Sequence, residues 1–266
     1  EKLIAGGDAL ARHPDGRAVL LQGALPGERV RARILEEKRD YLRAATLEVL
    51  EPVDARRLPP CEALARGCGG CDWLHIEPTA QLGFKAAIVT EALRRTARIS
   101  GIDVHPGGSV PDTAYRTTLR VALDESGRPA FRAAGSQRLV SVDHCLVAHP
   151  ALDELLAGLA LPGAREAVLR TGARTGERSV RWWPDTLPRP ATLPTEVRSG
   201  PHAFVHEIVA GVRLRVSADA FFQSSPEAAD LLVDAVRRAA GPAESWGRGP
   251  VLDAYGGVGL FAATLL

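Results

Sequence analysis

The chain has 266 residues, of which 45% are hydrophobic and 24% charged, and its formal net charge is +1. These are ordinary globular values, so they exclude extensive disorder and allow two or three compact domains. The small net charge excludes a generally basic protein, so any nucleic-acid contact must come from local patches. No stretch approaches the roughly 18 uninterrupted apolar residues of a membrane span, and the N-terminus lacks the apolar core of a signal peptide. We expect a cytoplasmic protein without membrane contact, and a monomer.

Residues 1–52 predict a small antiparallel β-barrel with turn signals at 13–16 and 25–27. Arginines alternate with apolar residues over 29–34, and the period of two returns over 46–49. The arginine row has two interpretations. It is a phosphate-binding surface for RNA, or it is a solvated surface neutralised by acidic neighbours. Those acidic neighbours are Glu36, Glu37 and Asp40.

The four cysteines are Cys61, Cys68, Cys71 and the distant Cys145. Thiolates repel one another unless a cation or cluster neutralises them, and the glycines at 69 and 70 let backbone N–H groups approach the sulfurs. This arrangement favours a buried iron-sulfur cluster. A structural zinc site is the nearest alternative, although such sites usually combine two Cys-x-x-Cys pairs. Two disulfides are a further alternative, which a reducing cytoplasm disfavours.

A helix is predicted after Cys71, because apolar residues recur there at helical spacing. Its predicted buried stripe consists of Leu82, Ala86, Val89 and Leu93. Residues 115–123 and 129–132, joined by a turn at 124–127, predict a β-hairpin. With Cys145 returning toward the Cys61 region, residues 53–214 form a predicted central α+β domain.

The next predicted helix starts with Ser225 as N-cap and Pro226 at its first position, and it ends at Gly241. Its predicted buried stripe consists of Leu231, Leu232, Ala235, Val236 and Ala239.

Residues 251–254 predict a buried parallel strand, and 255–259 a glycine-rich turn that opens into a helix. Together they predict the start of a Rossmann-like, doubly wound sheet. The turn fits two cofactors. Residues 257–262 match the dinucleotide pattern, whereas Asp253 with Gly257 and Gly259 fits Asp-x-x-x-Gly-x-Gly, the first motif of methyltransferases that bind S-adenosylmethionine. A purely structural glycine turn is the third interpretation.

An ordered set of motifs runs through the chain, and the set resembles the RNA 5-methyluridine methyltransferase family. The motifs are Pro60-Cys61, Cys68-Gly69-Gly70-Cys71-Asp72-Trp73-Leu74-His75, Tyr115-Arg116, Asp143-His144-Cys145, Phe221-Phe222-Gln223-Ser224-Ser225-Pro226 and Leu252-Asp253-Ala254-Tyr255-Gly256-Gly257-Val258-Gly259-Leu260-Phe261. The resemblance implies a multidomain α+β and α/β protein. Its parts are an OB-like TRAM barrel that binds RNA (1–52), an iron-sulfur domain (53–214) and the first part of a class I methyltransferase domain (215–266).

The resemblance also implies the site residues. Cys61, Cys68, Cys71 and Cys145 match the ligands of a [4Fe-4S] cluster, and the matches to S-adenosylmethionine contacts are Gln223, Asp253, Tyr255, Gly257 and Gly259. Two positions depart from the family pattern. Leu74 replaces the usual glutamine, and Leu260 stands where some members have a cofactor-binding asparagine.

The implied activity is S-adenosylmethionine-dependent methylation of carbon 5 of a uridine in tRNA or rRNA. In that mechanism a cysteine thiolate adds to carbon 6 of the base. All four cysteines are assigned to the cluster, so we name no catalytic residue and expect the chain to be truncated and inactive as it stands. Two alternatives stay open: an RNA-binding iron-sulfur module without catalysis, and a dinucleotide-dependent iron-sulfur oxidoreductase.

Overall fold

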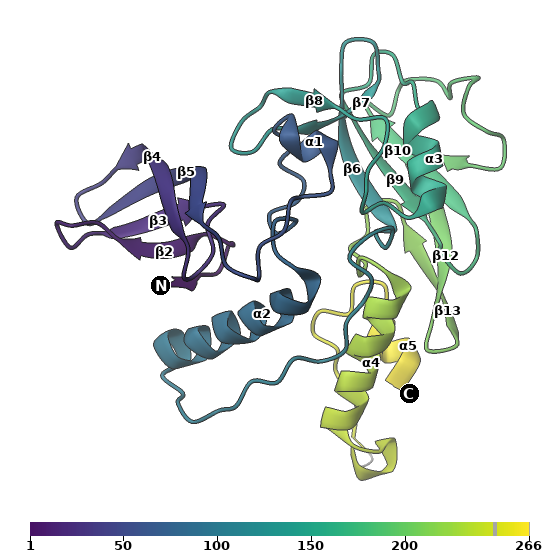
Figure 1. Cartoon of the computed structure of the whole chain (residues 1–266). Coiled ribbons are helices and arrows are strands. Elements are labelled where there is room, and N and C mark those ends of the chain that lie inside the picture. The colour runs from purple at the N-terminus through teal and green to yellow at the C-terminus, as the bar shows by residue number, and fades with distance from the viewer. Residues whose placement is uncertain (247–248, 266) are drawn as a thin grey trace. The chain divides into compact units, whose positions relative to one another are not determined.

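A computed structural model describes residues 1–246 and 249–265 (Figure 1). The chain divides into two compact units. The first comprises Glu1–Leu64 and Cys71–Gly107, and the second comprises Ala65–Gly70 and Gly108–Leu266. No helix among the described residues is long and apolar enough to cross a membrane.

The first unit contains a five-stranded sheet with the strand order β1-β2-β3-β5-β4. Its strands are β1 (Lys2–Leu3), β2 (Ala9–Arg12), β3 (Ala18–Gln22), β4 (Arg29–Glu37) and β5 (Tyr41–Glu51). Among the described residues no ladder joins β1 to β4, so the sheet is open where a closed barrel was predicted. Strand β1 has only two residues and offers few backbone groups for closure. The sheet is also not purely antiparallel as predicted, because β3 and β5 pair in parallel.

Helix α2 (Pro78–Ala92) packs on the core of this sheet through Ala80, Phe84 and Ile88. The predicted stripe is therefore wrong, and Val89 is 47% exposed. The orientation of the helix is fixed by Gln81, whose side-chain amide donates to the carbonyls of Trp73 and Ile76. These two acceptors lie outside the helix, so its periodicity alone does not reveal them.

The segment that follows the sheet is held by a buried ion pair between Glu28 and Arg56. The Glu28 side chain is fully buried and also accepts the backbone N–H of Leu25 at 2.8 Å. Burial raises the pKa of Glu28, but the hydrogen bond from Arg56 and its charge outweigh this and lower the pKa. The short helix α1 (Glu62–Ala65) comes next in the chain.

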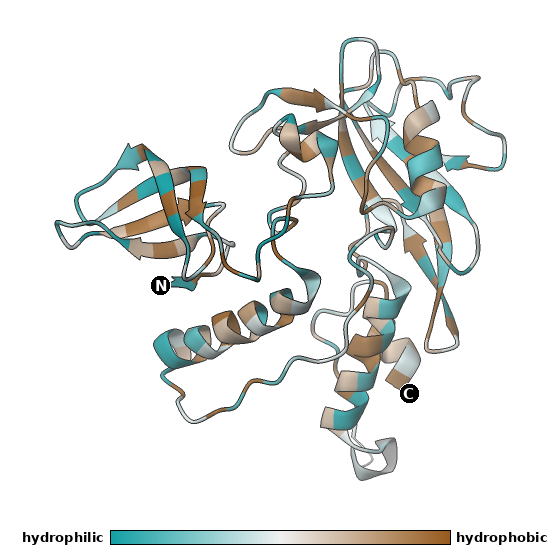
Figure 2. Ribbon diagram, viewed as in Figure 1, coloured by the Kyte–Doolittle hydropathy of each residue, from teal (hydrophilic) through white to brown (hydrophobic). Residues whose placement is uncertain are grey.

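The second unit is built on a six-stranded sheet with the order β11-β10-β9-β6-β7-β8. Its strands are β6 (Thr118–Leu123), β7 (Pro129–Arg132), β8 (Leu139–Ser141), β9 (Glu166–Thr171), β10 (Arg178–Trp183) and β11 (Arg198–Ser199). The predicted hairpin is confirmed as β6 and β7, with Asp124 accepting the backbone N–H groups of Ser126 and Arg128 in the turn. Helix α3 (Pro150–Gly158) buries Leu152, Leu155 and Leu156. Figure 2 shows apolar residues along the strands of this sheet.

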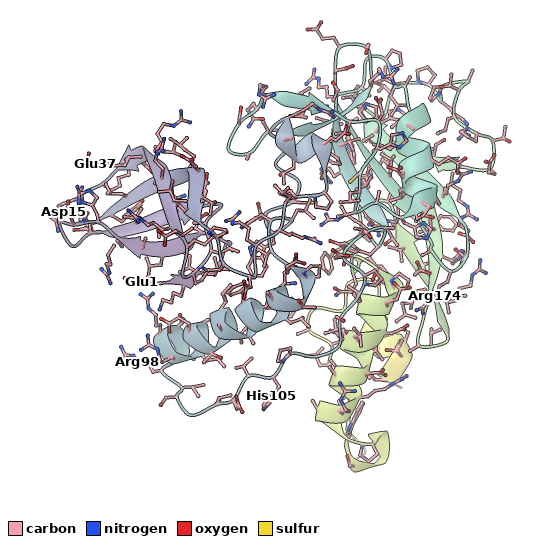
Figure 3. The ribbon with its side chains drawn as sticks, viewed as in Figure 1. Glu1, Asp15, Glu37, Arg98, His105 and Arg174 are labelled. Carbon is pink, nitrogen blue, oxygen red and sulfur yellow. The ribbon has the colours of Figure 1, made fainter. Side chains whose placement is uncertain are left out.

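Side chains tie a second hairpin, β12 (Phe204–Val209) and β13 (Val212–Ser217), to the connection between β9 and β10. Glu207 is buried and its carboxylate accepts the backbone N–H groups of Ala173 and Arg174. Arg174, labelled in Figure 3, pairs with Asp230 at 2.6 Å. The hairpin is thereby tied both to this connection and to helix α4.

Helix α4 (Pro226–Ala240) starts as predicted, with the Ser225 hydroxyl accepting the Ala228 N–H at 3.1 Å. Its predicted stripe is wrong: the buried residues are Pro226, Ala229 and Val233. Ala229 and Val233 share a core with Val209 and Leu214 of the hairpin and with Leu260 of α5 (Leu260–Leu265). The buried face of α4 is the one that packs against β12 and β13. The sequence of the helix alone does not show where that hairpin lies.

Candidate functional site

The glycine-rich turn forms as predicted and opens directly into α5. Gly257 and Gly259 have φ of 53° and 81°, and the Gly259 N–H donates to the Gly256 carbonyl at 2.7 Å. These positive φ values favour glycine because a side chain would clash with the backbone. The two glycines are therefore needed for the shape of the turn, whatever the turn binds.

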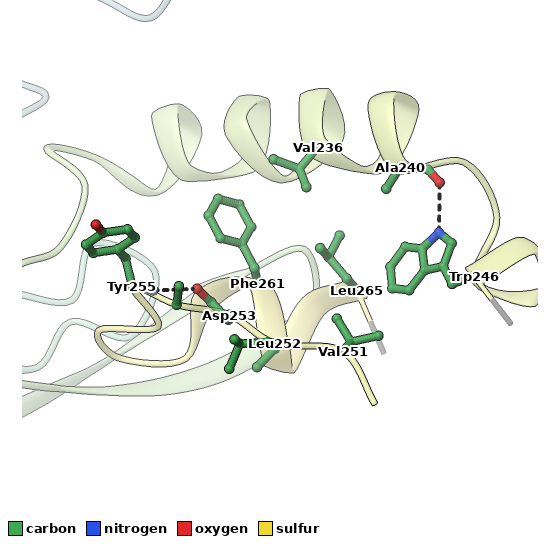
Figure 4. Close-up of a pocket in the computed structure, with 11 residues that line it drawn as sticks. Val236, Ala240, Trp246, Val251, Leu252, Asp253, Tyr255, Phe261 and Leu265 are labelled. Carbon is green, nitrogen blue, oxygen red and sulfur yellow. Dashed lines mark hydrogen bonds between the residues drawn. The ribbon is translucent and has the colours of Figure 1, made fainter. Parts of the chain in front are cut away.

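Asp253 supports the turn from its N-terminal side. Its Oδ1 accepts the backbone N–H of Tyr255 at 3.2 Å (Figure 4). Its Oδ2 is buried and has no hydrogen-bond partner among the described residues. A buried carboxylate oxygen without a donor is costly, so this atom is poised to accept hydrogen bonds from a ligand.

A cavity of about 480 Å³ lies beside the turn. Most of its wall is apolar, and it is formed by Val236, Ala240, Trp246, Val251, Leu252, Asp253, Ala254, Tyr255, Phe261, Ala262 and Leu265. Tyr255 and Trp246 lie at opposite ends of the drawn site. The carboxylate of Asp253 and the hydroxyl of Tyr255 are thus its main polar groups. A ligand with one polar and one aromatic part suits this combination.

The strand predicted over 251–254 does not form. Leu252 is 87% exposed and Tyr255 is 97% exposed. A strand needs a neighbour that pairs with its backbone groups, and no described strand lies beside this segment. The prediction of a buried strand is wrong for that reason.

The five predicted cofactor residues are only partly brought together. Asp253 and Tyr255 line the cavity, whereas Gln223, Gly257 and Gly259 are not among the residues that line it. Gln223 is half-buried in the segment 218–225, which precedes α4.

Segment 218–225 is fastened to the six-stranded sheet by Arg170, a residue that the sequence analysis missed. The side chain of Arg170 donates to the carbonyls of Ala218 and Ala220, at 3.4 and 2.6 Å. Arg170 is 4% exposed and burial lowers its pKa to about 10. Farther along the segment, the Thr117 N–H donates to the Ser224 carbonyl at 2.9 Å. Gln223 thus lies in a segment held at both ends.

The signal for Arg170 is an arginine within an otherwise apolar strand, since β9 runs Glu-Ala-Val-Leu-Arg-Thr. Its Nε has no partner among the described residues, and the same holds for Thr118 Oγ1 and Ser179 Oγ. These three residues are directly opposite one another on β6, β9 and β10. The six-stranded sheet therefore contains unpaired polar atoms around Arg170, the residue that binds segment 218–225.

A second cluster of charges surrounds Glu177, which accepts the His206 backbone N–H and the Arg213 side chain, both at 2.8 Å, and pairs with Arg198. Burial raises the pKa of Glu177, but these hydrogen bonds outweigh it and hold the pKa at about 2. Perturbed groups can mark functional sites, yet satisfied ion-pair networks perturb them as well. Both oxygens of the Glu177 carboxylate already accept hydrogen bonds. We therefore interpret the cluster as structural.

Cys61 and Cys71 belong to the first unit, and Cys68 and Cys145 to the second. None of the four forms a disulfide. In the described part of the chain, no three His, Cys, Asp or Glu side chains are grouped so that they could hold a metal ion. The described side chains therefore do not by themselves support the predicted cluster.

The glycines between Cys68 and Cys71 have a different role from the predicted one. The Gly69 N–H donates to the Arg132 carbonyl at 2.9 Å rather than to a sulfur. A Cβ on Gly69 would lie 2.9 Å from the backbone of Ala134. At Gly70 a Cβ would lie 3.5 Å from the sulfur of Cys68. Close backbone packing explains Gly69, and only Gly70 is adjacent to a thiol.

Comparison with known proteins gives the family. The TRAM domain family matches residues 1–47. An uncharacterized RNA methyltransferase of Streptomyces avermitilis is 33% identical over 98% of this chain and 66% of its own length. Another, from Gloeobacter violaceus, is 30% identical over 99% of this chain and 68% of its own length. The chain belongs to the RNA methyltransferase family.

The motifs resembled those of RNA methyltransferases, and membership of the RNA methyltransferase family is confirmed. The 23S rRNA (uracil(1939)-C(5))-methyltransferase RlmD of Chromohalobacter salexigens is 36% identical over 60% of this chain and 34% of its own length. The first relatives are longer proteins, of which this chain spans 63 to 66%.

The fold has a counterpart among solved structures. The tRNA (uracil-54, C5)-methyltransferase of Pyrococcus abyssi, in complex with S-adenosyl-L-homocysteine, matches with a TM-score of 0.69 and 21% identity. The match covers 97% of this chain and 70% of the other. At this identity the likeness shows the fold alone.

We predict that Arg170→Met lowers the free energy of unfolding by about 1.5 to 3 kcal/mol, the usual range for hydrogen bonds to a charged group. The expected loss comes from two backbone carbonyls that would lose their donor beneath segment 218–225. Urea denaturation measures it. The matched control is Arg238→Met, at an exposed position on α4, which should change stability by less than about 0.5 kcal/mol. Equal effects of the two substitutions would contradict an anchoring role for Arg170.

Proposed function

We propose that the protein transfers the methyl group of S-adenosylmethionine to carbon 5 of a uridine in RNA. The observation that carries the proposal is the unpartnered Oδ2 of Asp253, located beneath a glycine turn at the wall of a cavity. The likeness to RNA methyltransferases along 98% of the chain supports it. In the proposed organisation, residues 1–52 bind RNA, 53–214 form the central domain and 215–266 contribute the first cofactor-binding elements.

The cofactor supplies an electrophilic methyl group, and the residues of the chain hold it. Asp253 Oδ2 would accept hydrogen bonds from hydroxyl or ammonium groups of the cofactor. The exposed ring of Tyr255 would cover its apolar surface, and the amide of Gln223 would bind a polar end. Gly257 and Gly259 would let the ligand approach the backbone without a side chain in the way.

The proposed substrate is ribosomal or transfer RNA. The relative from Chromohalobacter salexigens, named for a uracil of 23S rRNA, favours ribosomal RNA. We assign no catalytic residue in this chain. A methyl transfer to carbon 5 of uracil uses a thiolate that adds to carbon 6, and all four cysteines are proposed as ligands.

The test is methyl transfer from labelled S-adenosylmethionine to unmodified ribosomal and transfer RNA by the complete natural protein. After digestion of the RNA to nucleosides, the label should co-migrate with 5-methyluridine. The matched control is RNA transcribed with 5-methyluridine in place of uridine, which has no free carbon 5 and should take up no label. Label in a different nucleoside would contradict the proposal. So would a protein that binds NADH and methylates nothing.

We also propose that Cys61, Cys68, Cys71 and Cys145 bind a [4Fe-4S] cluster. The spacing of the cysteines and the family resemblance support this proposal. The arrangement of the described side chains does not support it by itself. Binding of a cluster would contribute to the stability of the folded chain.

We predict that anaerobically purified protein is brown and contains iron and sulfide in equal amounts, about four of each per chain. Cys145→Ser should lower the colour, the iron content and the melting temperature, because one ligand is lost. Ser141→Ala, a substitution nearby in the sequence, should leave the colour and iron content unchanged. Stoichiometric zinc without sulfide would overturn the cluster in favour of the zinc alternative.

A further inference from the structure

Two of the three arginines in the row over 29–34 have carboxylate partners, whereas Arg33 has no ion pair among the described residues. Arg29 pairs with Glu51 at 3.0 Å and Arg31 with Glu48 at 2.7 Å. Outside the row, Arg17 pairs with Asp15 and Glu37, both of which are labelled in Figure 3. These carboxylates compete with phosphate for the arginines, and both interpretations of the row stay open. Arginines that lack such carboxylate partners are better suited to a further phosphate contact.

Three such arginines occur together in the second unit. Arg66, Arg132 and Arg138, which we name the guanidinium patch, belong to segments 65–70 and 132–141, and these segments contain no acidic residue. All three are exposed. None forms an ion pair within the described parts of the chain, and their hydrogen bonds go to neutral acceptors. Two acidic residues lie near the patch in the sequence. Asp143 pairs with Arg128 at 3.1 Å, and Glu62, four positions before Arg66, forms no ion pair with it among the described residues.

The backbone brings the three arginines together. Gly69 donates to the Arg132 carbonyl at 2.9 Å, and Ala134 donates to the Gly67 carbonyl at 3.2 Å. An isolated bridge also pairs Cys68 with Ala133. Segment 65–70 is thereby fixed beside the connection between β7 and β8, the region near the top of Figure 1. The patch is a property of the fold, since Arg66 is more than sixty positions from its two partners in the sequence.

The guanidinium groups are held in place without losing their capacity to bind. Arg66 donates to the Ser141 carbonyl at 3.0 Å, Arg138 donates to the Arg66 carbonyl at 3.2 Å, and Arg132 donates to Gln137 Oε1 at 2.9 Å. A Cβ on Gly67 would lie 2.7 Å from the Arg138 guanidinium, so glycine makes room for it. An arginine has five N–H donors, and each of these uses one in the bonds described.

We propose that the guanidinium patch binds the phosphate backbone of the RNA substrate. Planar guanidinium groups match phosphate oxygens in geometry and charge. The two segments contain no aromatic residue for base stacking, so the contact would be independent of base sequence. The choice of RNA as the polyanion depends on the proposed function. The position of the patch depends only on the structure.

The test is the salt dependence of binding to fluorescein-labelled polyuridylate, followed by fluorescence anisotropy. Each phosphate contact to a single strand contributes about 0.7 to the slope of log affinity against log salt concentration. Replacing Arg66, Arg132 and Arg138 together by glutamine should therefore flatten the slope by about 2 and weaken binding roughly tenfold or more at low salt. Replacing the same three residues by lysine should retain most of the slope, because the charges remain.

The matched control replaces Arg29, Arg31 and Arg43 by glutamine. This removes the same net charge from arginines that have carboxylate partners, so the slope should change by less than about 1. Arg132→Gln alone should flatten the slope by about 0.7, and its only described side-chain bond is to Gln137. It keeps the test decisive if the triple variant does not fold.

An unchanged slope in the patch variants would overturn the proposal. Equal flattening in the patch and control variants would also overturn it, because net charge alone would then explain binding. The methyl transfer assay separates this outcome from failure of the proposed function. Salt-dependent binding through the patch without methyl transfer would leave the patch intact and remove the function. Methyl transfer by a protein whose salt slope is unchanged in the patch variants would support the function and overturn the patch.

Discussion

The contact on which the candidate site depends is the one between the buried guanidinium of Arg170 and the carbonyls of segment 218–225. This bond fastens the segment that carries Gln223 to the central sheet, and the segment leads directly into the N-cap of α4 at Ser225. Helix α4 then packs against the core that also includes Leu260 of α5. The position of the glycine turn, immediately before α5, therefore follows from where the sheet holds the segment.

The local chemistry of this site could be predicted from the sequence. Ser225 followed by proline predicts the helix start, because the hydroxyl and the missing N–H both suit that position. Gly257 and Gly259 predict the turn, since few other residues tolerate its backbone angles. Each of these features is determined by residues that are neighbours in the chain.

Most of the features that were predicted wrongly depend on partners outside the element concerned. The buried faces of α2 and α4 are chosen by Gln81 and by β12 with β13, respectively. The strand over 251–254 fails because no described strand lies beside it, and Gly69 serves a backbone contact rather than a thiolate. The roles of Arg170 and of the guanidinium patch were missed for the same reason. A single arginine in a strand or a loop shows its role only when its acceptors are known.

The assignment of Asp253 Oδ2 as a cofactor acceptor is tested most directly by equilibrium dialysis of S-adenosylmethionine against the complete natural protein and its Asp253→Asn variant. The variant keeps an oxygen for the Tyr255 N–H but loses the charge and one acceptor, so binding should weaken roughly tenfold or more, equivalent to about 1.4 kcal/mol. Asp234→Asn, on the exposed side of α4, is the matched control and should bind as the unchanged protein does. Equal binding by the Asp253→Asn variant and the unchanged protein would contradict the account.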